Sequence, residues 1–168
     1  MKILVTYATR FGATEQVAEA IAETLREKGQ NVDLLPIESI TTLEEYQAVF
    51  LGSAVNYGAW LAHAVKFVKA KQEVFKDIQI ALFTVHITNL GRDEGSRRNR
   101  LTFSKEVRDL LNPIDEAFFA GKFDRRAARE LMPKWVARLV PTIDLRKWDR
   151  IRDWALQVLE RLEADLNY

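Results

Sequence analysis

Short apolar runs alternate with apolar residues at helical spacing along most of the chain, and this alternation limits the possible folds more than any other feature. The run Ile3 to Thr6 is followed by Val17, Ile21 and Leu25, and Gly29 ends the helix that their spacing predicts. The predicted strands cover residues 3–6, 32–35, 48–53, 78–85 and 117–120, and the predicted helices are centred on residues 17–25, 61–68, 103–111 and 148–162. A capped helical turn is also expected over residues 41–45.

Strands that alternate with helices predict a parallel sheet covered on both faces, because each right-handed crossover places its helix on one face. The run at residues 78–85 is nearly all apolar in its second half, as expected for a strand buried on both faces. Ligands of such sheets bind beyond the carboxyl ends of the strands. The loops after the first, third and fourth predicted strands are therefore the candidate binding site.

Length and composition limit the number of domains and the classes of chemistry that the chain can support. The 168 residues, 48% of them apolar, predict one globular domain, residues 1–168, with a substantial core. The sequence has no linker-like stretch, repeat or signal-peptide pattern, and no apolar run near the ~20 residues of a transmembrane helix. Without cysteine there is no disulfide framework or thiol nucleophile, and a cytoplasmic location is the default.

The first candidate loop, Thr9 to Thr14, lies between an apolar strand and a helix that opens at Glu15. Free backbone N–H groups and the helix dipole favour a phosphate there, and the two threonine hydroxyls are further donors. The loop has one glycine and no lysine, so it fits neither the Walker loop nor the dinucleotide fingerprint. An ordinary helix cap at Thr14 is the competing interpretation.

The second candidate loop runs from Gly52 to Trp60 and offers aromatic surfaces. Tyr57 and Trp60 could stack on a flat ring, and Gly58 would let the backbone approach it closely. Alternatively, the two aromatic residues pack the start of the next helix.

The third candidate loop, His86 to Arg98, is long for a connection within a compact domain, and long ordered loops are often functional. His86 could tune a bound ring or move protons, or it could be structural. Two separated histidines and no cysteine leave no credible metal site. A receiver domain is excluded because the first and third strands lack acidic ends, and no Gly-x-Ser-x-Gly elbow supports a serine hydrolase.

The chain as a whole resembles the flavodoxin superfamily, and within it the branch of menaquinone-dependent protoporphyrinogen dehydrogenases. The resemblance rests on the Thr9–Thr14 loop, the Gly52–Gly58 loop followed by Phe67-Val68, and Ala120-Gly121 leading into a basic, tryptophan-bearing insertion. The segment 144–149 also resembles that branch. This resemblance implies an α/β, flavodoxin-like three-layer sandwich with a five-stranded parallel sheet in the order 2-1-3-4-5 and an insertion after strand five.

The resemblance further implies flavin mononucleotide (FMN) as the cofactor. The residues expected to bind it are Thr9, Arg10, Phe11, Gly12, Ala13, Thr14, Ser53, Ala54, Val55, Asn56, Tyr57, Gly58, Val85, His86, Ile87, Thr88, Asn89 and Gly91. Arg10 and Ala13 depart from the usual hydrogen-bonding residues of flavodoxins, and the charge of Arg10 could help to balance the phosphate dianion. No catalytic acid or base is assigned.

The implied reaction takes electrons from a porphyrinogen-like substrate through FMN to a quinone or a redox protein, with no nucleic acid as partner. The alternative is an electron carrier that has no organic substrate of its own. Such carriers are typically strongly acidic, whereas this chain has a net charge of +1, and residues 122–152 carry ten Lys or Arg against four Asp or Glu.

The insertion at residues 122–145 carries apolar residues among basic ones, so it either contacts a membrane surface peripherally or caps the sheet. The apolar residues are Trp135, Val136, Leu139 and Val140, and the basic ones are Arg125, Arg126, Arg129, Lys134 and Arg138. Pro133 excludes one unbroken helix there unless it begins a new one.

Overall fold

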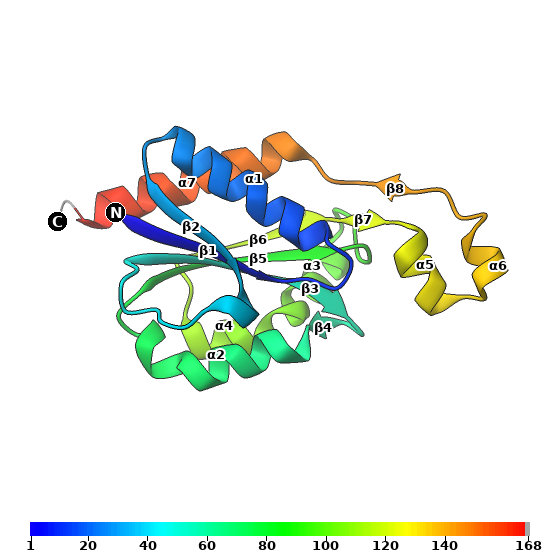
Figure 1. The fold of residues 1–168 in the computed structure, drawn as a ribbon, viewed down its shortest axis with the longest axis horizontal. Helices are drawn as coiled ribbons and strands as arrows, with labels where there is room; N and C mark the ends of the chain where they lie inside the picture. Colours follow the sequence, from blue (N-terminus) through cyan, green and yellow to red (C-terminus); the bar gives the residue numbers. More distant parts are fainter. Residues whose placement is uncertain (167–168) are drawn as a thin grey trace.

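A computed structural model describes residues 1–166 and contains a parallel sheet with the strand order β2-β1-β3-β5-β6 (Figure 1). The strands of this sheet are β1 (Lys2–Ala8), β2 (Asn31–Pro36), β3 (Ala48–Asn56), β5 (Gln79–His86) and β6 (Asp115–Ala120). Counted along the chain, these five strands have the predicted order 2-1-3-4-5. A two-residue strand, β4 (Ala59–Trp60), pairs antiparallel with β3 and was not predicted.

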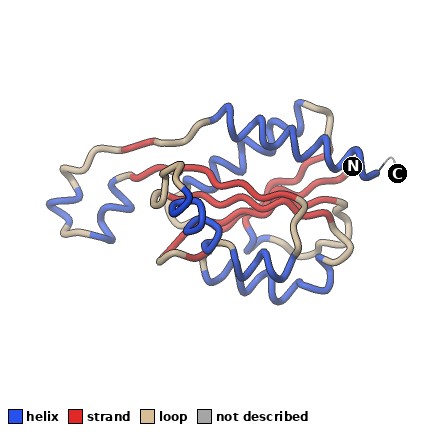
Figure 2. The backbone as a smooth tube through the Cα atoms, turned by 180° about the vertical axis from the view of Figure 1, so that it is seen from behind, coloured by secondary structure: helices blue, strands red, loops and turns tan. Residues whose placement is uncertain are grey.

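Helices cover both faces of the sheet, which confirms the predicted three-layer sandwich (Figure 2). Helices α1 (Ala13–Glu27) and α7 (Trp148–Leu166) pack together on one face, and α2 (Ala62–Phe75) and α4 (Lys105–Leu111) pack on the other. The short elements are the 3₁₀ helix η1 (Ile37–Ser39), α3 (Glu94–Phe103), β7 (Lys122–Phe123), α5 (Arg125–Leu131), α6 (Lys134–Ala137) and β8 (Ile143–Asp144).

The alternation of side chains along β1 divides the core into two clusters. Ile3 and Val5 point toward α1 and α7, whereas Leu4 points toward α2 and α4, and all three are fully buried. Complete burial of each such side chain stabilises the fold by about 1.5–3 kcal/mol. Trp154 of α7 completes the first cluster by edge-to-face contact with Phe50, with ring centroids 5.6 Å apart.

Two local expectations differ from the structure in detail. No helix forms over residues 41–45; η1 lies just before them, and a single turn, in which Tyr46 N donates to the Leu43 carbonyl at 3.1 Å, joins these two buried residues. The helix predicted around residues 103–111 is present as α4, but it begins at Lys105, because Ser104 separates it from α3, which was not predicted. The Ser104 hydroxyl is buried and donates to Glu116 of β6.

The insertion after β6 extends beyond one end of the sheet as a separate arm (Figure 1). Strands β7 and β8 form its antiparallel stem, and α5 and α6 form its tip. Pro133 separates the two helices and precedes the first residue of α6, as its missing N–H predicts. Among residues 1–166 no helix is long and apolar enough to cross a membrane.

Candidate functional site at the carboxyl edge of the sheet

The three predicted loops meet at one edge of the sheet because their strands are in register. Ala8, the last residue of β1, lies opposite Ser53 of β3, and Ala54 lies opposite Val85 of β5. Arg10 then links the first loop to the second, since its Nη1 donates to Asn56 Oδ1 at 2.8 Å. The predicted convergence of these loops is present in the structure.

The first loop ends at Gly12, whose φ of 89° places it in the left-handed region that favours glycine. Gly12 is the N-cap of α1, and no side chain caps this helix end. The Gly12 N–H donates to Thr9 Oγ1 at 3.0 Å, which tightens the turn. The predicted alternative, a side-chain cap from Thr14, is therefore wrong.

Thr14 has a polar side chain whose environment at this helix end is unusual. Its side chain is buried, and its Oγ1 has no hydrogen-bond partner among the residues that the structure describes. A buried hydroxyl without a partner costs free energy, on the order of 1–3 kcal/mol. Together with the uncapped N-terminus of α1, this hydroxyl fits an anion whose oxygens would accept from both.

The insertion reaches back to the first loop through three arginine contacts. Arg126 of α5 donates from Nη2 to the carbonyl of Phe11 at 2.9 Å, and the same Nη2 lies 3.7 Å from the position of a Cβ on Gly12. Arg10 pairs with Glu130 of the same helix. These contacts place a guanidinium directly beside the candidate phosphate loop.

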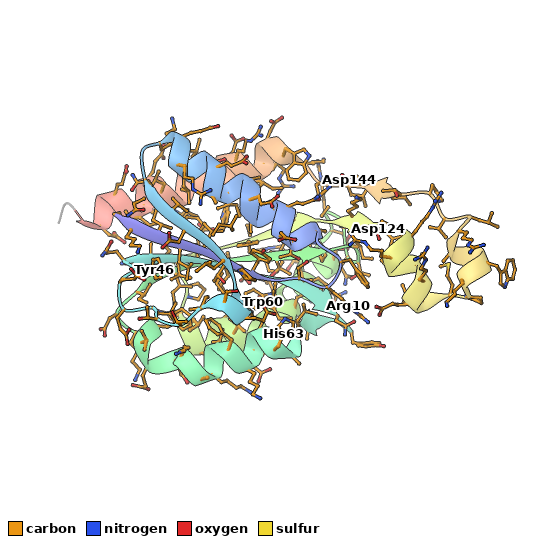
Figure 3. All side chains as sticks on the ribbon, viewed as in Figure 1. Arg10, Tyr46, Trp60, His63, Asp124 and Asp144 are labelled. Carbon is orange, nitrogen blue, oxygen red and sulfur yellow. The ribbon has the colours of Figure 1, made fainter. Side chains whose placement is uncertain are left out.

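The third contact comes from the return strand of the insertion. Arg146 donates from Nη1 to Gln16 of α1, and its guanidinium stacks over Trp148, 4.6 Å from the ring centroid. Its ion pair with Asp144, at 2.6 Å, lowers the pKa of that carboxyl to about 2. Both ends of the insertion are thereby fixed to α1 and its loop. Figure 3 labels Arg10 in the first loop, and Asp124 and Asp144 in the insertion.

The second loop is shorter than predicted because β3 continues to Asn56 and turns tightly into β4. Tyr57 and Gly58 form the turn with φ of 50° and 75°, a conformation that is unfavourable for tyrosine. The Tyr57 side chain is 97% exposed. A strained aromatic residue with an uncovered ring is typical of a ligand-contact position.

Trp60 has the opposite environment. It is 3% exposed, and its Nε1 donates to Thr84 Oγ1 at 2.8 Å in the core under α2. This burial supports the expectation that Trp60 packs the start of the next helix. Of the two aromatic candidates, only Tyr57 faces solvent.

The third loop also proves shorter than predicted, because α3 begins at Glu94 and the segment up to Arg98 is helical. Arg100 of α3 holds the loop by donating from Nη1 to the carbonyls of Asn89 and Gly91, at 2.6 Å each. Asn89 has a φ of 55°. The loop is therefore ordered by backbone contacts, while Ile87 and Thr88 remain exposed.

His86 is buried at the end of β5, and its ring lies 5.5 Å from that of Phe103. Because a carbonyl only accepts, His86 Nδ1 is the donor in its 2.7 Å contact with the Thr88 carbonyl. Burial lowers the pKa of His86, and the positive charge of Arg100 acts in the same direction. These contacts favour the structural interpretation of a neutral imidazole.

Among the remaining predicted site residues, Ser53 and Val85 are buried within the strands. The Ser53 hydroxyl donates to the Ala54 carbonyl and accepts from Leu61 N at 3.2 Å, so it holds the start of α2. Ala54, Val55 and Asn56 belong to the half-exposed end of β3, not to a loop. No cluster of three potential metal-ligating residues occurs among residues 1–166.

Sequence reasoning did not identify Arg126, Glu130 or Arg146 as parts of this site. Each lies more than a hundred positions from its partner. The basic character of residues 122–152 was visible in the sequence, but their contact with the first loop was not.

A doubly wound parallel sheet with an uncapped helix end and an exposed aromatic turn at its carboxyl edge defines a flavodoxin-like α/β protein. The flavodoxin domain family matches residues 4–136, and the chain therefore belongs to that family.

Individual similarities are low. The protoporphyrinogen IX dehydrogenase [quinone] of Escherichia coli (strain K12) is 28% identical over 114 residues, which are 67% of this chain and 61% of that protein. The enzyme of the same name from Leishmania major is 27% identical over 114 residues, 66% of this chain and 48% of that protein. The chain thus spans roughly half to three fifths of the length of these curated relatives.

Among solved structures, a flavodoxin from the domain Archaea has a TM-score of 0.61 at 16% identity, covering 97% of this chain and 99% of that one. The rubredoxin oxygen:oxidoreductase of Desulfovibrio gigas has a TM-score of 0.60 at 14% identity, covering 99% of this chain and 37% of that one. At these identities the likeness shows a shared fold.

Proposed function

We propose that the chain binds FMN at the carboxyl edge of the sheet and is a flavin-dependent oxidoreductase. The observation that carries the proposal is the buried, unpartnered Thr14 hydroxyl at the uncapped N-terminus of α1. A phosphate monoester there would accept from Thr14 and from the first N–H groups of α1. Arg126 would add a positive charge beside it.

The flavin ring would lie near the second and third loops. Tyr57 offers an exposed ring for stacking, and the loop at residues 87–93 presents backbone groups at a fixed position. The bound flavin supplies the capacity to accept and donate electrons. The protein binds it, orients it and limits its contact with water.

Reconstitution of the purified protein tests this proposal. Addition of FMN should give a visible flavin spectrum that survives desalting, and riboflavin, which lacks the phosphate, should bind more weakly. Thr14→Val keeps the shape of the side chain and removes its hydroxyl, so it should weaken FMN binding without weakening riboflavin binding. Failure of the wild-type protein to retain FMN would refute the cofactor assignment.

The proposed reaction takes electrons from a protoporphyrinogen-type donor through FMN to a quinone. It is supported by the activity named for the E. coli and L. major relatives. A further relative from Methylocella silvestris, 28% identical over 88 residues, is named NAD(P)H dehydrogenase (quinone), so a quinone is common to both names.

The arm of the insertion is proposed to contact the membrane surface in which a quinone dissolves. Trp135 and Leu139 are 70% and 77% exposed, and Leu131 beside them is also exposed. They belong to or adjoin helices α5 and α6, which extend beyond the edge of the sheet (Figure 1). Their exposure supports the membrane contact over the alternative that they cap the sheet. Exposed apolar side chains among Arg and Lys are typical of segments that lie on anionic membranes.

Anaerobic mixing tests the reaction. Protoporphyrinogen should bleach the flavin absorbance of the holoprotein, and menaquinone should then restore it. An oxidised flavin after this mixing, together with reduction by a flavodoxin reductase, would instead indicate an electron carrier without an organic substrate of its own.

Co-sedimentation with anionic vesicles tests the membrane contact. The Trp135→Ser and Leu139→Ser double variant should lose binding, and neutralising Arg125 and Arg129 should weaken it in a salt-dependent way. Both side-chain pairs are exposed, so the fold should be retained. Unchanged sedimentation of either variant would reject the corresponding part of the proposal.

A further inference from the structure

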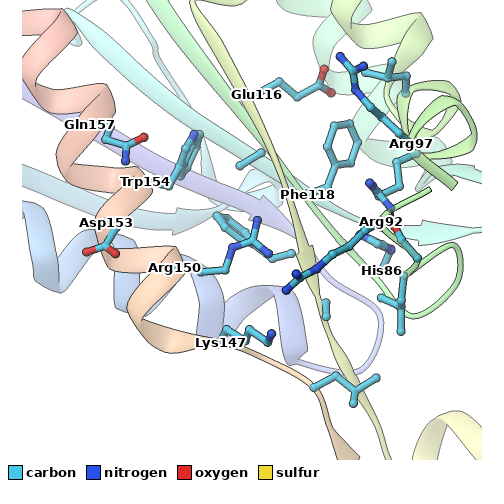
Figure 4. A pocket seen from close by; sticks show the side chains of 18 residues that line it. His86, Arg92, Arg97, Glu116, Phe118, Lys147, Arg150, Asp153, Trp154 and Gln157 are labelled. Atoms are coloured by element: carbon cyan, nitrogen blue, oxygen red, sulfur yellow. Dashed lines mark hydrogen bonds between the residues drawn. The ribbon is translucent and has the colours of Figure 1, made fainter. Parts of the chain in front are cut away.

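A large groove runs along the open edge of β6 and adjoins the third candidate loop. Its volume is about 1090 Å³, and it lies between α3 on one side and α7 on the other (Figure 4). One end is formed by His86, Leu90 and Gly91, so it begins at the loop that follows β5. The floor includes the half-buried ring of Phe118 and the indole of Trp154.

Three cations line this groove without a partner. The side chains of Arg92, Lys147 and Arg150 have no hydrogen bond or ion pair with any of residues 1–166. They come from two separate elements, since Arg92 follows β5, Lys147 precedes α7 and Arg150 lies in its first turn. The side chains of Arg92 and Arg150 extend toward each other across the groove (Figure 4). Unpaired cations that converge from different elements indicate an anionic ligand.

The carboxylates of the groove do not neutralise these cations. Glu116 already pairs with Arg108 at 2.8 Å, and it also accepts a hydrogen bond from Ser104. Asp153 lines the groove one turn beyond Arg150 and has no cationic partner among residues 1–166. Arg97 and Arg100, the other cations of the lining, are held by Glu94 and by backbone carbonyls.

We propose that this groove binds the carboxylate groups of the organic electron donor, and that Arg92 and Arg150 are the residues that recognise them. The ligand class is a multi-ring molecule with two carboxylates, whose apolar body lies along the open edge of β6 against Phe118. This inference rests on the proposed function, because a porphyrinogen with two propionates is a donor of that class. The groove begins at the third loop, so a ligand bound in it would lie next to the proposed flavin site.

Binding of protoporphyrin IX, the oxidised form of the donor, tests the groove without requiring turnover. Its fluorescence would be titrated with FMN-loaded wild-type protein and with the Arg92→Gln/Arg150→Gln double variant. The matched control is Arg98→Gln/Arg152→Gln, which changes the net charge equally on α3 and α7 at exposed residues that do not line the groove. The dimethyl ester of the porphyrin, which has no carboxylate charge, is the matched ligand control.

The double variant should raise the Kd for protoporphyrin IX about 4- to 25-fold, since exposed charge pairs each contribute about 2- to 5-fold. The control variant should stay within about 2-fold of wild type, and the dimethyl ester should bind all three proteins alike. Equal weakening by both double variants, or the same Arg dependence for the ester, would overturn the groove assignment.

The two proposals fail separately. If porphyrin binding depends on Arg92 and Arg150 but protoporphyrinogen leaves the flavin oxidised, the groove assignment is supported and the proposed reaction fails. If protoporphyrinogen reduces the flavin of wild type and double variant equally at subsaturating donor, the reaction is supported and the groove assignment fails.

Discussion

Replacement of Arg126 by glutamine should weaken FMN binding without affecting riboflavin binding. Arg126 comes from the insertion, yet its Nη2 lies 2.9 Å from the Phe11 carbonyl at the centre of the candidate phosphate loop. A phosphate dianion at the N-terminus of α1 would therefore interact with this guanidinium. The glutamine side chain would retain a hydrogen-bond donor of shorter reach but carry no charge.

The exposure of Arg126 sets the expected loss of FMN binding free energy. Its side chain is 66% exposed, so the aqueous limit of Coulomb's law applies, about 1 kcal/mol per pair of unit charges at 4 Å. A dianion doubles this, and Asp124, 3.5 Å from Arg126 Nε, offsets part of it. We expect a loss of about 1–2 kcal/mol, or roughly 5- to 30-fold in the Kd for FMN.

Flavin fluorescence quenching during titration of the apoprotein measures both dissociation constants. Arg125→Gln is the matched control, because Arg125 is the adjacent exposed residue of α5 and its replacement removes the same charge. The difference between wild type and Arg126→Gln should shrink as salt is raised toward about 1 M. A comparable loss of riboflavin affinity, or an equal effect of Arg125→Gln on FMN, would refute a direct phosphate contact.

Three further substitutions distinguish residues that bind the flavin from residues that stabilise the fold. Tyr57→Gly should weaken FMN and riboflavin binding to a similar extent, while the urea midpoint stays equal or rises because glycine adopts the positive φ without strain; a lower midpoint would contradict this. Trp60→Phe removes the hydrogen bond to Thr84 and should cost about 1–2 kcal/mol of unfolding free energy in urea titrations, with FMN affinity unchanged. Asp144 has a pKa lowered to about 2 by Arg146, so its contribution to stability is complete above the unfolded pKa near 4 and is lost as the pH falls toward 2. Asp144→Asn should therefore reduce stability at pH 7 more than at pH 2, and equal reductions at both would exclude this ion pair as the cause.

The sheet and its loops could be predicted from the sequence because the signals that define them are local. Strand β5, at residues 79–86, is apolar enough to be placed inside a parallel sheet by its composition alone. Once the strands are parallel, their carboxyl ends share one edge, and the three loops must lie together there. Register then brings Ala8 opposite Ser53 without further information.

The different environments of Tyr57 and Trp60 could not be predicted from local sequence signals. Both residues were plausible flavin contacts, yet the turn at Tyr57 and Gly58 reverses the chain into β4 and returns Trp60 opposite Val55. Trp60 then reaches the core, while Tyr57 stays at the tip of the turn. A tight turn centred on Tyr-Gly lacks the usual Asn-Gly or Asp-Gly signal, so the sequence did not distinguish the two environments.

The contacts between the insertion and the first loop or α1 could not be predicted, because they join residues that are far apart in the sequence. Arg126 to Phe11 spans 115 positions, and Arg146 to Gln16 spans 130. Such contacts have no periodicity to mark them, and their partners include a backbone carbonyl that carries no sequence information. Only the folded stem of β7 and β8 brings them together.

Helix α5 connects the candidate cofactor site with the exposed tip of the arm. Arg126 and Glu130, four positions apart, face the first loop, whereas Arg125 and Arg129, each one position earlier, lie on the neighbouring face in solvent. Leu131 ends the same helix and is exposed with Trp135 and Leu139 beyond it. If binding of the tip to a surface shifts α5, it would therefore also shift Arg126 relative to the first loop. By linkage, the factor by which that surface tightens FMN binding must equal the factor by which FMN tightens binding to the surface.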